Sequence, residues 1–199
     1  MNLTKTQINV LVGSILGDAF LQSTGKNNAR LRFEHSQDQK EYLRWKVNFF
    51  GRLFQGKETY LERVHPKTNK TYKYVRHQTT STPSLGFYHK LFYSNNGKKK
   101  VPENIKEFLD NPLALCVWYL DDGYYYAKDK NSLIYLGKVT KREATLLSDA
   151  LVSNFQLNNK IYDKKNKGFA LFFGVNETKI LHSIISKFII SEMKYKIEE

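Results

Sequence analysis

The sequence predicts an α+β fold that consists of two pseudo-symmetric αββαββα repeats, each with an antiparallel sheet. An apolar segment of helical character that ends on an acidic residue occurs twice, as LVGSILGDA at residues 11–19 and as LCVWYLDDG at residues 115–123. The two copies lie about half the chain apart, which is the pattern of an internal duplication. The chain has 199 residues, of which 41% are hydrophobic, so each repeat can bury a core.

The segments that follow the two copies correspond in their order. After each copy come a strand-like segment, a helical segment, a β-rich pair and a closing helix. These are residues 31–36, 39–54, 57–79 and 82–94 in the first half, and residues 132–139, 141–155, 159–175 and 177–190 in the second. We therefore expect an N-terminal repeat at 1–97, a basic link with a short helix of its own at 98–112, and a C-terminal repeat at 113–199.

Two glycines interrupt the first apolar helix. Gly13 and Gly17 lie four residues apart and so share one face, although each costs a helix about 1 kcal/mol relative to alanine. Without side chains on that face another backbone can approach closely. The alternative is that Gly17 only caps the helix.

The charge of the chain favours a polyanionic partner. It has 32 Lys+Arg against 19 Asp+Glu, a net charge of +13, which suits nucleic acid or an anionic membrane surface. No apolar run reaches the ~18 residues of a membrane span, and MNLTKTQ does not resemble a secretion signal, so we expect no membrane segment and no secretion. The single cysteine, Cys116, allows no disulfide framework or cysteine-based zinc site, and the histidines show no metal-ligand spacing.

The two motif copies resemble the nine-residue motif of the LAGLIDADG homing endonucleases. The resemblance is to the single-chain type of the group I intron branch, and it covers nearly the whole chain. It implies that the two motif helices pack side by side, with two saddle-shaped sheets, in a monomer. The copies differ, because Val117, Trp118 and Asp121 stand where the first copy has Gly13, Ser14 and Gly17.

The resemblance also implies a function, which is cleavage of both strands of a long, asymmetric DNA site to leave short 3′ overhangs. Asp18 and Asp122, at the penultimate motif position, would hold two or more Mg²⁺ ions, with Gly17 and Asp121 beside them in the metal site. Mn²⁺ would substitute, and Ca²⁺ would support binding without cleavage. The host compartment would be a bacterial cytoplasm or an organelle. By position, further catalytic candidates are Lys99, Lys196, Gln37 and Lys138.

The strands supply candidates for contact with double-stranded DNA, because a β-ribbon fits the major groove. Side chains alternate along a strand, so Arg30, Arg32 and Glu34 share one face. The candidates of the first half are Arg30, Arg32, Glu34, Lys73, Tyr74, Arg76 and Gln78, and those of the second half are Tyr124, Tyr126, Lys128, Lys160 and Tyr162. Phosphate contacts that read no sequence are the alternative for any one of them.

Two other functions stay open on the same scaffold. One is an RNA maturase, whose partner would be the intron RNA. The other is a sequence-specific DNA-binding protein that does not cleave. The acidic residues at the ends of both motif copies argue against loss of cleavage, but maturases keep them too.

Overall fold

A computed structural model describes residues 2–197, and the contacts between residues divide the chain into two compact units. The first unit contains Asp18–Lys90, and the second contains Thr4–Gly17 together with the chain from Leu91 onward. The first motif helix therefore belongs with the second half of the chain. The predicted boundaries at residues 97 and 112 divide the chain by its sequence repeat, whereas these units divide it by contacts. Those boundaries stay a prediction.

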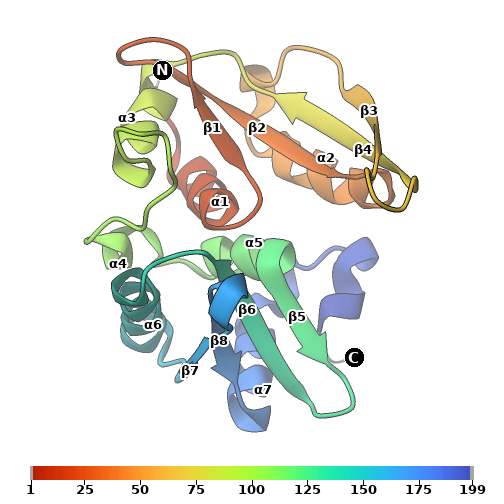
Figure 1. Ribbon diagram of the computed structural model, residues 1–199. Helices are drawn as coiled ribbons and strands as arrows, with labels where there is room; N and C mark the ends of the chain where they lie inside the picture. Colours follow the sequence, from red (N-terminus) through yellow and green to blue (C-terminus); the bar gives the residue numbers. More distant parts are fainter. Residues whose placement is uncertain (1, 198–199) are drawn as a thin grey trace. The chain divides into compact units, whose positions relative to one another are not determined.

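The first unit is a four-stranded antiparallel sheet covered on one face by a helix (Figure 1). Its elements are β1 (Phe20–Ser23), β2 (Ala29–Ser36), α2 (Lys40–Asn48), β3 (Thr59–Val64), β4 (Thr71–Gln78) and all but the last two residues of α3 (Pro83–Phe92), and the strand order is β1-β2-β4-β3. Leu31 and Phe33 of β2 are fully buried on the face that α2 covers, together with Leu43 of that helix. Alternate residues of β2 thus build the core and leave the other face of the sheet to polar side chains.

The second unit contains the other sheet, with the equivalent order β5-β6-β8-β7, and both motif helices. Its elements are α1 (Lys5–Leu16), α4 (Ile105–Phe108), α5 (Pro112–Asp122), β5 (Gly123–Tyr126), β6 (Asn131–Gly137), α6 (Lys141–Phe155), β7 (Lys160–Asp163), β8 (Phe169–Phe173) and α7 (Val175–Ile185). A 3-10 helix, Ser191–Lys196, follows near the end of the chain. The prediction of an α+β fold with two antiparallel sheets in similar halves is confirmed.

Two predicted helices are shorter than the sequence pattern indicated. The apolar run at 39–54 forms α2 only as far as Asn48, and a 3-10 turn, Gly51–Leu53, follows. Gly51 has a φ of +49°, which an α-helix cannot contain. The run at 177–190 ends its α-helix at Ile185 and continues as a 3-10 turn, Ser186–Phe188. Pro83 does begin α3, and the basic link does carry a helix, α4.

Helix α1 packs against α5 (Figure 1), and its glycine face is the one in contact. A Cβ atom added to Gly13 would meet the Ala114 carbonyl oxygen and would lie 2.9 Å from the Val117 Cβ, and one added to Gly17 would lie 2.5 Å from the Asp121 Cβ. Gly17 does end the helix, but its φ of −90° is open to any residue, so close approach is what requires glycine here. The predicted side-by-side packing of the two motif helices is confirmed, but only α1 has a face of glycines, because α5 presents Val117 and Asp121 there.

Between residues 2 and 197, no helix is both long enough and apolar enough to cross a bilayer.

Candidate functional site

The second unit brings the ends of the two motif helices together. Gly17, which caps α1, lies against Asp121 in the last turn of α5. Asp122 is the final residue of α5, and both aspartates are half-buried. In the chain, Asp18 directly follows Gly17, as Asp122 follows Asp121.

Two lysines donate hydrogen bonds to backbone carbonyls at these helix ends. Lys99 Nζ donates to the Gly17 oxygen at 2.7 Å. Lys196 Nζ donates to the Asp121 oxygen at 3.3 Å and to the Gly123 oxygen at 3.0 Å. The last carbonyls of a helix have no partner within the helix and carry partial negative charge, so an ammonium group suits them.

The two lysines share one contact in equivalent positions of the two halves, and Lys196 has a second bond, to Gly123. Gly17 and Asp121 hold the same place in the two motif copies, each directly before the penultimate acid. Each lysine thus bonds the carbonyl just before the acid of one copy. Lys99 and Lys196 were selected by position in the sequence, and the structure places both at the helix ends. Their roles in catalysis stay a prediction.

Lys196 is held in place by its own backbone. The Tyr119 hydroxyl donates to the Lys196 carbonyl oxygen at 2.7 Å. Tyr119 is fully buried, and its hydroxyl also lies 3.2 Å from both the Ser132 hydroxyl and the His182 Nε2. Burial raises the pKa of Tyr119 well above its ordinary value, so this hydroxyl keeps its proton. The hydrogen bond from Tyr119 therefore anchors the backbone of Lys196, from which its side chain extends.

Asp18 belongs to the first unit and is exposed there. Its side chain is 52% accessible and lines a polar depression of about 420 Å³ on the open face of the first sheet. The Nδ1 atom of His35, which is nearly fully buried, lies 4.0 Å from the Asp18 Oδ2. The sequence did not single out His35, because its only signal is the alternation of β2, which places it on the buried face.

The other two catalytic candidates, Gln37 and Lys138, lie in different settings. Gln37 is exposed at the start of a 3-10 turn, and the glutamine that lines the depression with Asp18 is Gln39. No signal in the sequence distinguishes the two glutamines. Lys138 is exposed just after β6 and lines a cavity of about 200 Å³ together with Lys99.

The open face of the first sheet carries most of the predicted DNA-contacting residues of that half. The register pairs Arg32 with Gln78 and Glu34 with Arg76, so these four side chains share a face. Arg30 and Tyr74 lie on it too. So does Arg63 of β3, which was not among the predicted contacts because its face follows from the pairing of β3 with β4. Lys73 lies on the opposite face, where its Nζ is 3.6 Å from Glu62.

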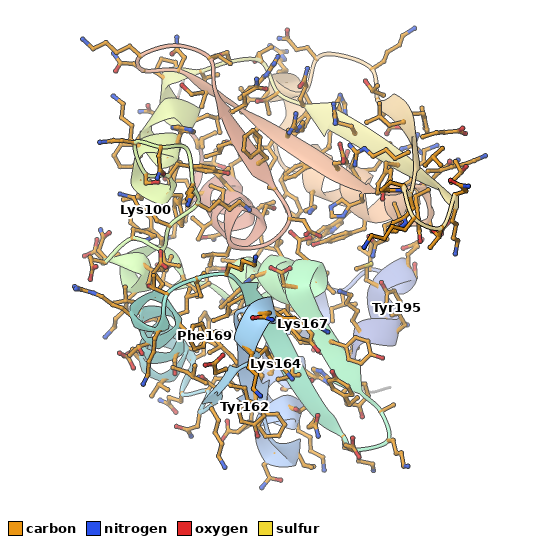
Figure 2. All side chains as sticks on the ribbon, in the orientation of Figure 1. Lys100, Tyr162, Lys164, Lys167, Phe169 and Tyr195 are labelled. Atoms are coloured by element: carbon orange, nitrogen blue, oxygen red, sulfur yellow. The ribbon has the colours of Figure 1, made fainter. Side chains whose placement is uncertain are left out.

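The corresponding face of the second sheet is mainly aromatic, and Lys160 of β7 lies on it as well. Tyr124 packs edge-on against Tyr126, with 4.5 Å between ring centroids, and the Tyr126 and Tyr135 hydroxyls lie 2.8 Å apart. Tyr162 of β7 stacks on Phe172, with 4.8 Å between ring centroids, and Lys164 follows it at the edge of the sheet (Figure 2). Two further predicted contacts, Lys128 after β5 and Lys160 at the start of β7, are exposed. The two sheets therefore share a topology but present different chemistry.

Each unit supplies carboxylates of the kind that a hard divalent cation binds. Asp18 in the first unit and Asp121 and Asp122 in the second are carboxylates that are at least partly accessible. Mg²⁺ and Ca²⁺ prefer oxygen ligands of this kind. The Gly17 carbonyl, also predicted for the metal site, accepts the Lys99 bond and has a second lone pair.

Comparison with known proteins identifies the family. The profile of the LAGLIDADG DNA endonuclease family matches residues 8–181. The chain belongs to this family.

Several relatives are similar over almost the whole chain. It is 26% identical over 202 residues to probable intron-encoded endonuclease 1 of Wickerhamomyces canadensis, covering 98% of this chain and 85% of that protein. It is 26% identical over 213 residues to DNA endonuclease I-ChuI of Chlamydomonas applanata, covering 100% of this chain and 97% of that protein. It is also 26% identical over 200 residues to the cytochrome b mRNA maturase bI2 of Debaryomyces hansenii, covering 98% of this chain and 74% of that protein. Over 130 residues it is 32% identical to a RecA protein of Mycolicibacterium flavescens, of which it spans 28%.

Solved structures agree with this assignment. The homing endonuclease I-WcaI bound to its DNA recognition sequence superposes with a TM-score of 0.88 and 27% identity, covering 100% of this chain and 88% of that one. I-DmoI in complex with DNA and Mn superposes with a TM-score of 0.55 and 17% identity, covering 94% of this chain and 100% of that one. At this identity the likeness shows the fold alone.

Proposed function

We propose that this protein is a homing endonuclease that binds one long, asymmetric duplex site and hydrolyses both DNA strands. One observation carries the proposal beyond family membership. Lys99 and Lys196 donate to equivalent backbone carbonyls, each directly before the acidic residue that ends a motif copy. A purely structural pair of crossing helices does not require a cation at both ends.

The proposed roles follow from charge. Asp18 and Asp122 are the carboxylates that would hold Mg²⁺, with the Gly17 carbonyl and Asp121 beside them, and Mn²⁺ would substitute. When bound, the metal lowers the pKa of a water and offsets charge on the phosphate. Lys99 and Lys196 supply fixed positive charge, which favours the additional negative charge of the transition state. Structures of I-DmoI with DNA and Mn, and with DNA and Ca, are in line with divalent metals in this fold.

The proposed DNA contacts use the open faces of the two sheets. Arg, Glu and Gln side chains on a β-ribbon can reach base edges in the major groove, and the net charge of +13 favours the phosphates. Because both motif copies are in one chain, one molecule would supply both halves of the site. A monomer and 3′ overhangs belong to the same proposal.

Asp18→Asn and Asp122→Asn test the two acids. Each substitution keeps the size of the side chain but removes its charge, so each is expected to abolish Mg²⁺-dependent cleavage of both strands. Binding of the same duplex in Ca²⁺ should persist, since Ca²⁺ would support binding but not cleavage. The measurements are a gel assay of cleavage in Mg²⁺ and a binding titration in Ca²⁺.

Two exposed aspartates, Asp38 in the first unit and Asp129 in the second, provide matched controls. Their Asn variants should cleave normally. Cleavage near the wild-type rate by either Asp18→Asn or Asp122→Asn contradicts the assignment, and so does rapid cleavage by the wild type in Ca²⁺ alone.

A maturase is the second candidate function, and similarity to the Debaryomyces hansenii maturase over 98% of this chain favours keeping it. The assay is splicing of the intron that encodes this chain, with and without the protein. Stimulated splicing that survives Asp122→Asn, together with no cleavage of the intronless DNA junction, would favour the maturase.

A further inference from the structure

Glu34 on the open face of the first sheet lies between two arginines. Its Oε2 accepts from the Arg76 Nε at 2.7 Å and lies 2.6 Å from the Arg76 Nη2. Its Oε1 lies 2.7 Å from the Arg63 Nη2. Arg76 is the cross-strand partner of Glu34 on β4, and Arg63 reaches it from β3. Side-chain exposure is 22% for Glu34, 28% for Arg76 and 49% for Arg63.

This carboxylate is ionised at neutral pH. Partial burial acts to raise the pKa of Glu34, but the hydrogen bonds from Arg76 and Arg63 outweigh it and hold the pKa below its ordinary value. Both carboxylate oxygens are engaged by guanidinium groups. To accept a hydrogen bond from the amino group of a cytosine, the base that glutamate can read, Glu34 would have to give up part of this network.

The same contacts fix the two guanidinium groups. Arg76 uses its Nε and Nη2 for Glu34, so its Nη1 takes no part in the ion pair and the outer Nη1–Nη2 edge keeps donors for another acceptor. The Arg63 guanidinium carbon lies 4.7 Å from the centroid of the Tyr74 ring. An arginine held in this way loses less side-chain entropy when it binds, and its planar fork matches the O6 and N7 atoms of guanine.

The three residues line the same polar depression as Asp18, together with Arg32 and Phe20. Arg32 lies over the Phe20 ring, with 4.9 Å between its guanidinium carbon and the ring centroid. The depression therefore presents oriented guanidinium groups on a concave surface next to a candidate catalytic residue.

We propose, on the basis of the proposed function, that Glu34 is a positioning residue that does not read a base itself. It holds Arg76, supported by Arg63, so that Arg76 recognises a guanine in the half-site bound by the first sheet. The duplex site should therefore contain a guanine whose recognition depends on both Arg76 and Glu34.

The test is a binding profile in Ca²⁺, which separates recognition from cleavage. A duplex bound by the wild type is selected from a random library, and affinities are measured for every single-base change of it. Arg76→Ala should lose the preference for one guanine, which we expect to be about tenfold or more in the wild type, as good bidentate contacts give. Glu34→Gln should lose most of the preference at the same position, although its overall affinity is unchanged or higher. Glu34→Asp should restore part of it.

Glu62→Gln is the matched control. Glu62 lies on the opposite face of the same sheet, beside Lys73, and its substitution makes the same change in net charge. It should leave the guanine preference intact, and its circular dichroism and melting temperature should match those of Glu34→Gln.

Three results overturn the inference. They are an unchanged guanine preference in Glu34→Gln, no lost guanine preference in Arg76→Ala, and loss of a cytosine preference in Glu34→Gln at a position that Arg76→Ala leaves unaffected. Failure of the wild type to select any duplex contradicts the proposed function instead, so the two failures are distinguishable.

Discussion

Gly13 sets how closely α1 approaches α5. A side chain at this position would meet the Ala114 carbonyl oxygen and the Val117 Cβ. Gly13→Ala should therefore lower the free energy of unfolding by about 1–3 kcal/mol, the usual cost of overpacking. This loss is expected even though alanine favours an isolated helix by about 1 kcal/mol. Urea denaturation of the two proteins measures the difference.

Gly25→Ala is the control for this substitution, because nothing lies within 4 Å of a Cβ added there. Its stability should change little. A Gly13→Ala protein as stable as the wild type would show that the glycine face does not determine the packing of the two helices.

Single residues differ in how well the sequence predicts them. The motif acids could be identified because the pattern occurs twice, and the glycine face of the first copy because Gly13 and Gly17 lie four residues apart. Lys99 and Lys196 could be proposed only by position, since the chain has 32 Lys+Arg and nothing local distinguishes them. His35, Gln39 and Arg63 were missed because their place near the site depends on which strands pair, and strand pairing is not local in the sequence.

At the scale of the elements, the start of α6 connects that helix to the basic link. Thr140 and Glu143 form a capping box, in which the Glu143 Oε2 accepts from the Thr140 backbone N–H at 2.7 Å. The Glu143 Oε1 also accepts from the Val101 N–H at 2.9 Å. Partial burial acts to raise the pKa of Glu143, but hydrogen bonds from the Thr140 and Val101 backbones outweigh it and lower the pKa.

Glu143→Ala should lower the free energy of unfolding at pH 7 by about 1–3 kcal/mol, because it removes a cap and leaves the Val101 N–H without its acceptor. A carboxyl with a lowered pKa stabilises the fold above its ordinary value of 4.5. That contribution disappears as pH falls through the lower pKa of the folded state. The difference between wild type and variant, measured by denaturation from pH 7 to pH 3, should therefore shrink below pH 4.5.

Glu103→Ala is the comparison, since Glu103 forms an exposed ion pair with Arg142. Such pairs contribute about 0–1 kcal/mol. A difference between wild type and Glu143→Ala that stays constant with pH would contradict the role of the ionised carboxylate.

The elements themselves were predicted well because their signals are local. The start of α3 at Pro83, the strand alternation of β2 and the helix in the basic link can all be read from short segments. The ends of α2 and α7 could not, because an apolar run continues past the residue where the α-helix changes to a 3-10 turn.

At the scale of the whole molecule, the two halves share a fold but not a surface. The first sheet presents arginines held by Glu34, and the second presents tyrosines. Duplication explains the common topology, which the sequence predicts from its repeat. It does not predict which chemistry each face carries once the two copies have diverged.

The difference between the halves gives a prediction for the lysines. If each lysine serves one strand, Lys99→Ala and Lys196→Ala should slow cleavage of different strands. Nicked circles should then accumulate before linear DNA on a supercoiled plasmid that carries the site, with the nick on opposite strands in the two variants. Strand-specific end labels identify which strand is cut.

Lys98→Ala provides a matched control within the basic run of three lysines, and it should behave as the wild type. Equal slowing of both strands by both variants, or no slowing by either, contradicts the assignment. Lys98, Lys100 and Lys194 would then be the next candidates, and the assignment of the acids would be unaffected.

Selection of cleaved molecules from a random duplex library in Mg²⁺ tests most directly whether this protein is a site-specific endonuclease. The expected result is one long, asymmetric sequence, cut on both strands with short 3′ overhangs, and no product from the same library with Asp18→Asn or Asp122→Asn. A library that stays intact under conditions in which the wild type is folded and binds duplex DNA would contradict the proposed function, as would equal cleavage by the two aspartate variants.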